Sequence, residues 1–154
     1  MDALYGIVLT VHSVLRYFAI LAGAAAVVQA LISLFSSGSF EKRHKLSNLA
    51  FMIFTDVQLL LGLVLYGVLS PITRAAFADF GGAMKETIPR YWAVEHLTGM
   101  LLGIIGVHVA YFFAKRAQKD RAKHLWAGVG FAISLLIILG SIPWPFMPAG
   151  RGLW

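Results

Sequence analysis

Eight of the polar side chains that lie inside the apolar stretches of the sequence stand out. Their types could do chemistry: imidazoles bind metal ions and cofactors, carboxyls carry protons, and a guanidinium binds anions. Because polar groups are costly in lipid and normally face the interior of a helix bundle, we expect the function to depend on them. They are His12, Arg16, Asp56, Gln58, Glu95, His96, His108 and Ser134.

His12 and His96 are the most informative of these residues because they fall at the same depth. Counted from the helix ends near Tyr5 and Arg90, each lies roughly 10 Å inside, at about 1.5 Å per residue. Their helices run in the same direction and sit diagonally in an up-down-up-down bundle. The two imidazoles are therefore expected to meet across the bundle axis.

The helix faces that carry these histidines bear few large side chains. Steps of three or four residues lead from His12 to Ala19, Gly23, Ala26 and Ala30, and from His96 to Gly99, Gly103, Gly106 and Ala110. One interpretation is close helix packing through a small-xxx-small seam. The other is room for a flat macrocycle, a haem whose iron is bound by both histidines, and their matched depth favours it.

Arg16 and Asp56 are expected at similar depths near the bilayer centre, where either charge alone would be costly. The simplest interpretation is a structural ion pair between adjacent helices. Alternatively, Arg16 binds a haem propionate or Asp56 belongs to a proton path. Glu95 lies nearer the surface and could pair with Arg90, orient a ligand histidine or handle protons for a quinone. The sequence leaves these alternatives open.

His108 is a weaker ligand candidate. It follows His96 by twelve residues, which at about 100° per residue turns it roughly 120° away, almost opposite the glycine face. We therefore expect one haem, with a second, inner haem as the weaker alternative. His44 and His124 lie beside Lys and Arg near helix ends and are expected to be solvated or to face headgroups.

Four apolar segments must position these residues. The 154 residues are 59% hydrophobic and 13% charged, and their mean hydropathy is +0.78, whereas a soluble domain is roughly a quarter charged. Each segment is near the roughly 20 residues that cross a hydrocarbon core. We predict one all-α transmembrane domain over residues 1–154, an up-down-up-down bundle with helices at about 4–35, 46–69, 91–115 and 124–143.

The loops predict the orientation of this bundle. Eight of the thirteen Lys and Arg residues lie in the loops after the first and third helices, which by the positive-inside rule face the cytoplasm. Both termini, the loop 70–90 and the tail 144–154 then lie outside a bacterial inner membrane. Since topology explains the net charge of +6, little supports a nucleic-acid partner, and the lipid bilayer is the first partner expected.

The tail that begins at Ile142 is rich in prolines and aromatic residues and contains Arg151. Its prolines are expected to stop the fourth helix. The tail could form an interfacial belt, which is slightly favoured, or a lid over an outer cofactor with Arg151 near the haem propionates. The loop 70–90 is expected to carry a short interfacial helix.

Several segments resemble those of a known group of membrane proteins. They are His12-Ser-Val-Leu-Arg-Tyr17, Met84-Lys85, Arg90-Tyr-Trp-Ala-Val-Glu-His96 and Ser141-Ile-Pro-Trp-Pro. They look like those of small four-helix proteins, mostly from Bacteroidetes and related bacteria, known as cytochrome B. More distantly, the chain is similar to the four-helix haem-binding units of membrane di-haem cytochromes b and of haem A synthase.

The resemblance implies haem b bound by membrane histidines and electron transfer, with quinone as a candidate partner. By this resemblance, His12 and His96 are the candidate ligands of the haem iron. Some such proteins have histidine at the position of Asp56, so the aspartate here weakens the case for a second haem.

The leading hypothesis is a b-type membrane cytochrome that transfers electrons near the outer face, alone or as a subunit of a respiratory or photosynthetic complex. An electron-transfer role is favoured over that of a stand-alone enzyme. The second hypothesis is a haem-free accessory subunit whose glycine faces pack helices and whose apolar surface binds larger partners. The third is a proton or metal transporter that uses Asp56, Glu95 and the histidines.

Overall fold

The computed structural model describes residues 2–152, and in that range it contains long helices and no strand. Four helical spans are long and apolar enough to cross a membrane. The first is α1 (Asp2–Phe35); the second joins α2 (Lys42–Val64) to a π-helical turn, η1 (Leu65–Leu69). The third joins α5 (Thr87–Arg90), the π-helical η2 (Tyr91–Glu95) and α6 (His96–Arg116), and the fourth joins α7 (Asp120–Leu125), the π-helical η3 (Trp126–Gly130) and α8 (Phe131–Gly140). The predicted all-α, four-helix architecture is confirmed.

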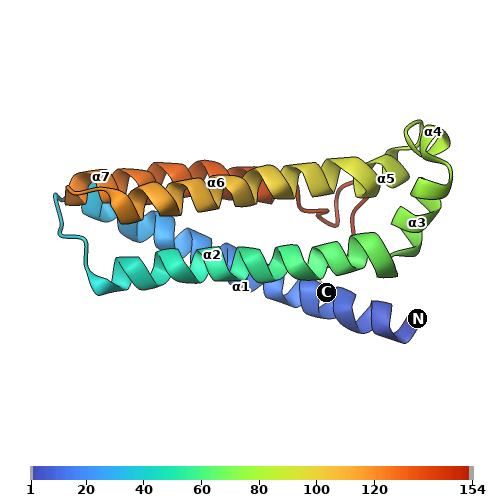
Figure 1. Cartoon of the computed structure of the whole chain (residues 1–154), viewed down its shortest axis with the longest axis horizontal. Helices are drawn as coiled ribbons and strands as arrows, with labels where there is room; N and C mark the ends of the chain where they lie inside the picture. The colour runs from blue at the N-terminus through green and yellow to red at the C-terminus, as the bar shows by residue number, and fades with distance from the viewer. Residues whose placement is uncertain (1, 153–154) are drawn as a thin grey trace.

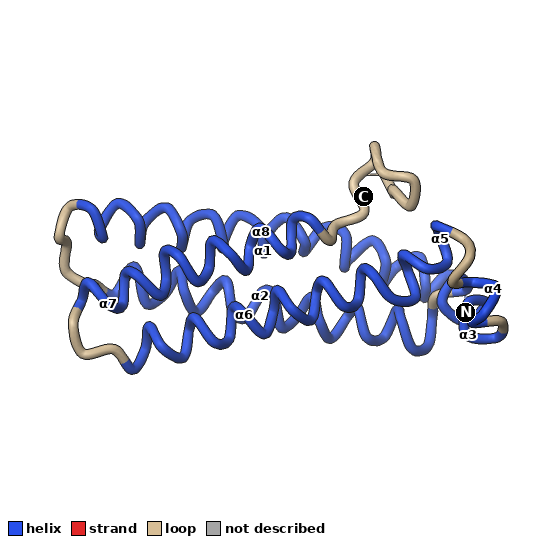
Figure 2. Tube along the Cα trace, turned by 90° about the horizontal axis from the view of Figure 1, so that it is seen from above, coloured by secondary structure: helices blue, strands red, loops and turns tan. Residues whose placement is uncertain are grey.

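The four spans form an elongated bundle (Figure 1). The first span packs against the second and fourth, and the third packs against the same two, so that α1 and α6 lie diagonally across the bundle. Figure 2 shows the spans running side by side along the whole length of the molecule. Successive spans alternate in direction, as an up-down-up-down bundle requires.

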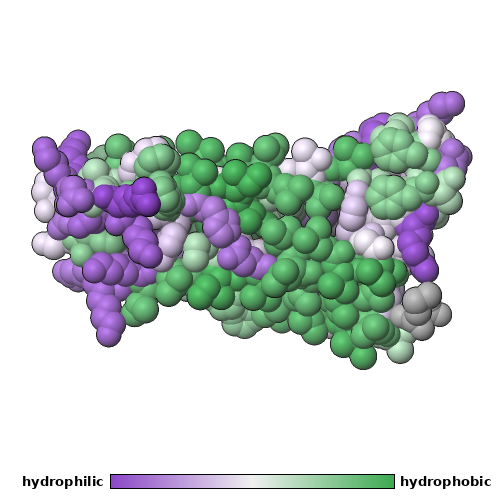
Figure 3. All heavy atoms as spheres, viewed as in Figure 1, coloured by the Kyte–Doolittle hydropathy of each residue, from purple (hydrophilic) through white to green (hydrophobic). Residues whose placement is uncertain are grey.

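The surface of the bundle is that of a multi-pass membrane protein. Large apolar side chains point outward from every span, among them Leu21, Leu60, Leu102 and Leu136, of which Leu136 is 68% exposed. On the face in view, Figure 3 shows a broad apolar band across the middle of the molecule, with hydrophilic side chains gathered mainly at its two ends and a smaller hydrophilic patch within the band. A soluble monomer rarely exposes so extensive an apolar surface, so this band faces lipid.

The helix ends follow local sequence signals. The fourth span ends at Gly140, three residues before the predicted boundary of 143, because Pro143 lacks an amide hydrogen and disfavours helical backbone in the residue before it. The second span begins at Lys42 rather than at 46, and the Glu41 amide at its start donates to His44 Nδ1 at 3.0 Å. Basic residues thus extend the helices beyond their apolar segments.

The loop between the second and third spans is helical, as the sequence predicts. It contains α3 (Pro71–Ala78) and the single turn α4 (Phe80–Ala83). Ser70 caps α3 by accepting the Thr73 amide at 3.3 Å, and Pro71 occupies the first helical position, where its missing hydrogen costs nothing. The loop closes the end of the bundle that carries the start of α1.

The centre of the bundle is held by an aromatic contact. Phe51 of α2 and Phe131 of α8 are fully buried, with ring centroids 5.3 Å apart and ring planes nearly perpendicular. Gly23 of α1 makes room for this contact, because a Cβ there would lie 2.7 Å from the Phe51 ring. At least one glycine of the small-residue face of α1 therefore serves helix packing.

His44 and His124 are fully buried at the basic end of the bundle. The expectation that they are solvated or face headgroups is therefore wrong. Their ring centroids are 4.8 Å apart. His44 Nε2 lies 3.0 Å from Ser33 Oγ, and His124 Nε2 donates to the Gly38 carbonyl at 3.1 Å. The two imidazoles hold the loop between α1 and α2 against α7, and His124 Nδ1 is buried without a hydrogen-bond partner among residues 2–152.

Candidate functional site

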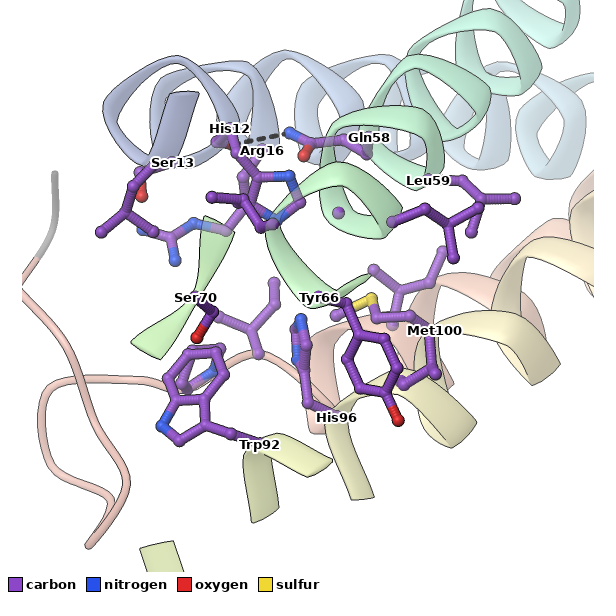
Figure 4. Close-up of a pocket in the computed structure, with 18 of the residues that line it drawn as sticks. His12, Ser13, Arg16, Gln58, Leu59, Tyr66, Ser70, Trp92, His96 and Met100 are labelled. Carbon is purple, nitrogen blue, oxygen red and sulfur yellow. Dashed lines mark hydrogen bonds between the residues drawn. The ribbon is translucent and has the colours of Figure 1, made fainter. Parts of the chain in front are cut away.

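A cavity of about 120 Å³ lies inside the bundle near the end that carries the start of α1. All four spans and the tail contribute to its walls, which are mostly apolar (Figure 4). The polar and aromatic residues that line it include Tyr5, His12, Arg16, Gln58, Tyr66, Trp92, His96 and Arg151. The structure thus brings His12, His96, Arg16 and Arg151 to one cavity.

His12 and His96 occupy opposite walls of this cavity. In Figure 4 the His12 side chain enters from α1 and the His96 side chain from α6, and the two point toward one another. Their helices are diagonal neighbours, so the side chains approach across the bundle axis. The two imidazoles thus face each other across the bundle axis, as their equal depth in the sequence predicts.

His12 is positioned by contacts with the second span. Gln58 Nε2 donates to the His12 carbonyl at 2.9 Å, which ties α1 to α2 at this level. Gly62 leaves space for the ring, since a Cβ there would lie 3.4 Å from His12 Cε1. His12 Nδ1 is buried and finds no hydrogen-bond partner among residues 2–152. Buried polar atoms normally find partners, so the described part of the chain leaves this ring nitrogen unsatisfied.

His96 is oriented by the end of α8. Its Nδ1 lies 2.7 Å from the Ser141 carbonyl, which can only accept, so Nδ1 carries the proton. The Tyr91 hydroxyl donates to the same carbonyl at 2.8 Å. This carbonyl is available because the helix stops one residue earlier. With Nδ1 protonated, Nε2 keeps its lone pair, which is the state of a histidine that binds a metal.

The helix changes its winding next to this histidine. The π-helical turn η2 ends at Glu95, directly before His96, and the π-helical turn η1 contributes Tyr66 to the cavity wall. Such turns are rare and occur often at functional sites. The sequence offers no plain signal for either turn.

Two arginines supply positive charge to the cavity. The Arg16 guanidinium lies 4.9 Å from the ring centroid of Tyr17 and 5.9 Å from that of Trp144. Arg151 donates to the Tyr5 hydroxyl at 2.8 Å, and its guanidinium lies 4.9 Å from the Trp92 ring centroid. The tail therefore folds back over the cavity and brings Arg151 to it.

Arg16 and Asp56 do not form the ion pair that the sequence suggested. Asp56 Oδ1 lies 2.7 Å from His108 Nε2 instead, and both side chains are more than a third exposed. The two side chains point in different directions because of how their helices are rotated about their axes. Arg16 lines the cavity, whereas Asp56 lies outside it and contacts His108 of α6. His108, the weaker ligand candidate, is accordingly outside the cavity.

Glu95 also lies outside the cavity lining. Arg90 Nε donates to Glu95 Oε1 at 2.7 Å, and both side chains are exposed. Of the roles considered for Glu95, pairing with Arg90 is the one that this geometry displays.

The glycine face of α6 is filled by α8. A Cβ at Gly99, Gly103 or Gly106 would collide with Ser141, Ile138 or Ser134, respectively. The expectation that this face leaves room for a macrocycle is therefore wrong, and its small residues serve close helix packing. The open space lies beside His12 and His96.

Sequence reasoning missed several residues of the cavity. Tyr5, Tyr66 and Trp92 line it, and the Ser141 carbonyl orients His96. Trp92 precedes His96 by one helical turn, and this spacing could have placed it on the same face. Nothing in the sequence indicated that a tail residue would reach Tyr5.

Comparison with known proteins yields no relative: no family model matches the sequence, and no curated protein or solved structure matches it. Within residues 2–152, no group of three or more His, Cys, Asp or Glu residues is placed to hold a metal ion. The cavity therefore offers two facing imidazoles rather than a cluster of protein ligands.

Proposed function

We propose that the protein is a b-type membrane cytochrome in which His12 and His96 bind the iron of one haem. The observation that carries the proposal is the pair of imidazoles facing each other in a mostly apolar cavity, with His96 Nδ1 held by the Ser141 carbonyl. A histidine that binds metal usually donates its other nitrogen to a carbonyl or carboxylate, as His96 does.

The chemical types of the residues that line the cavity suit a haem. Two side-chain ligands suffice for this group because its macrocycle supplies the remaining ligands of the iron. Apolar walls and aromatic rings suit a flat macrocycle, and Arg16 and Arg151 would bind its propionates. The 120 Å³ of free space is below the roughly 300–1,000 Å³ of typical ligand pockets, so binding requires the lining side chains and the tail to move apart.

Haem supplies one-electron chemistry when it is bound. The chain's own contribution is to hold the two imidazoles, to exclude water with the apolar walls, and to place two positive charges nearby. Exclusion of water and the surrounding charge set the reduction potential of such a site. The proposed role is electron transfer, alone or as a subunit of a respiratory or photosynthetic complex, with quinone as a candidate partner.

The proposal includes an orientation. If the basic loops face the cytoplasm of a bacterium, the cavity lies near the outer face of its inner membrane. Electron transfer is then expected near that face. A donor or acceptor would approach the end of the bundle formed by α3, α4 and the tail.

The test is haem binding by purified variants made under haem-replete expression. The wild type is expected to show a b-type α band in a reduced-minus-oxidised spectrum, and His96→Ala is expected to lose it together with the bound haem. His108→Ala is the matched control and is expected to keep both, because His108 lies outside the cavity. If His96→Ala does not fold, restoration of the band in His96→Gly by added imidazole tests the same ligand.

A haem-free accessory subunit is the competing function, and the glycine face packed against α8 is the observation in its favour. It predicts that the wild type purifies without haem even when haem is abundant. That result would reject the cytochrome proposal. Proton or metal flux without a chromophore would instead favour a transporter.

A further inference from the structure

A second cavity of about 390 Å³ lies at the opposite end of the bundle, between α2 and α6. We call it the basic groove, because four of its lining residues are Lys or Arg and none of them is Asp or Glu. The residues that matter here are Lys45, Asn48, Tyr111, Lys115, Arg116 and Lys123. The proposed haem site does not use any of them.

Most of the positive charge of the basic groove is not neutralised by the protein. Lys123 Nζ pairs with Asp120 at 2.8 Å. Lys45 and Lys115 are exposed and form no ion pair within residues 2–152. The Arg116 guanidinium lies 4.3 Å from the Phe112 ring centroid, which leaves its hydrogen-bond donors available. The groove therefore presents an excess of cations from two neighbouring spans.

Asn48 adds a polar group that the fold leaves unsatisfied. It is only 3% exposed, it lines the groove, and its Oδ1 has no hydrogen-bond partner in the described part of the chain. Buried amides normally find partners, and an oxygen that only accepts needs a donor, such as a water or a headgroup hydroxyl. A contact with a phosphate oxygen can come only from the amide nitrogen of Asn48, Nδ2.

The surroundings of the groove are those of a membrane interface. It lies where α2 and α6 reach their basic ends. Toward the membrane centre the same two helices expose apolar side chains, namely Leu49 and Ile53 on α2 and Val109 and Phe112 on α6. They also expose the pair of Asp56 and His108, which joins the two helices. A ligand with an anionic head and hydrocarbon chains matches both parts of this surface.

We propose that the basic groove binds the phosphate headgroup of an anionic membrane phospholipid. Lys45, Lys115 and Arg116 contact the phosphate, Asn48 donates to it, and the acyl chains lie along the apolar surfaces of α2 and α6. Basic pockets between transmembrane helices commonly take such headgroups. A free phosphate would share the polar contacts but not the apolar ones, and this difference separates the two sources.

The test is thermal unfolding of the purified, delipidated protein in detergent, titrated with phosphatidylglycerol, phosphatidylcholine or inorganic phosphate. Phosphatidylglycerol is expected to raise the unfolding temperature, and the other two are not. Lys45→Gln/Lys115→Gln is expected to bind phosphatidylglycerol about thirtyfold more weakly, and Lys115→Gln alone about fivefold. Native mass spectrometry of the bound lipid gives a second readout that does not depend on unfolding.

Lys42→Gln/Lys119→Gln is the matched control, because it removes the same charge from the same end but not from the groove. It is expected to keep the affinity of the wild type. Equal weakening in the control would show a general effect of charge and overturn the proposal. The proposal would also be overturned if Lys45→Gln/Lys115→Gln bound phosphatidylglycerol as tightly as the wild type. An equal response to phosphatidylcholine, or a response to inorganic phosphate as large as that to the lipid, would overturn it as well.

Discussion

The Ser141 carbonyl connects the end of α8 to the orientation of His96. It accepts from His96 Nδ1 at 2.7 Å and from the Tyr91 hydroxyl at 2.8 Å. Helix termination normally leaves such carbonyls without a partner, and here two side chains of the third span satisfy one of them. The prolines that follow Ser141 thus contribute to the site by stopping the helix at the right residue.

The pair formed by Asp56 and His108 is a second local feature with a measurable effect. Its atoms are 2.7 Å apart on two membrane-spanning helices, and both side chains are more than a third exposed. Hydrogen bonds between transmembrane helices contribute modestly, so a double-mutant cycle with Asp56→Leu and His108→Leu is expected to give a coupling energy of roughly 0.6–1.7 kcal/mol. Thermal unfolding of the four proteins in detergent measures it. Additive effects of the two substitutions would show that the contact does not stabilise the fold.

At the scale of the helices, α6 and α8 approach closely because α6 carries glycine where α8 carries larger side chains. A Cβ at Gly103 would lie 2.5 Å from Ile138 Cγ1 and 3.3 Å from the Ser134 carbonyl oxygen. Gly103→Ala is therefore expected to destabilise the bundle by about 1–3 kcal/mol, the usual cost of overpacking. Unfolding midpoints in detergent test this expectation.

Gly67→Ala is the control for this substitution, since a Cβ there meets nothing within 4 Å among residues 2–152. It is expected to leave the midpoint unchanged or to raise it slightly, because alanine favours helix. If both variants lost the same stability, backbone effects rather than the contact between α6 and α8 would account for the change.

The four spans and the meeting of His12 and His96 could be predicted because both follow from counting along helices. Apolar length fixes a span, and equal depth on parallel, diagonal helices brings side chains together. The partner of Asp56 could not be predicted in this way, because it depends on how each helix is rotated about its axis, which packing decides. The burial of His44 and His124 and the contact of Arg151 with Tyr5 depend on loop and tail conformations that have no periodic pattern.

At the scale of the whole molecule, the two cavities lie at opposite ends of the bundle. The cavity with His12 and His96 is near the start of α1 and the tail, and the basic groove is near the loops after α1 and α6. If the basic end is cytoplasmic, the protein would transfer electrons near one leaflet and bind anionic lipid in the other. The orientation of the chain therefore decides the biological meaning of both sites.

The chain contains no cysteine, which makes its orientation straightforward to measure. Single substitutions Asp79→Cys, in the loop after the second span, and Lys119→Cys, between α6 and α7, place a thiol at either end. In intact spheroplasts, a membrane-impermeant thiol reagent is expected to label the first variant and not the second. Labelling of Lys119→Cys alone would reverse the orientation and contradict the positive-inside interpretation.

The most direct measurement of the central claim is an electron paramagnetic resonance spectrum of the oxidised, purified protein. Two histidine ligands predict a low-spin ferric haem, with one haem per chain and loss of the low-spin signal in both His12→Ala and His96→Ala. A purely high-spin signal, or a low-spin signal that survives both substitutions, would contradict the assignment of His12 and His96 as the ligands.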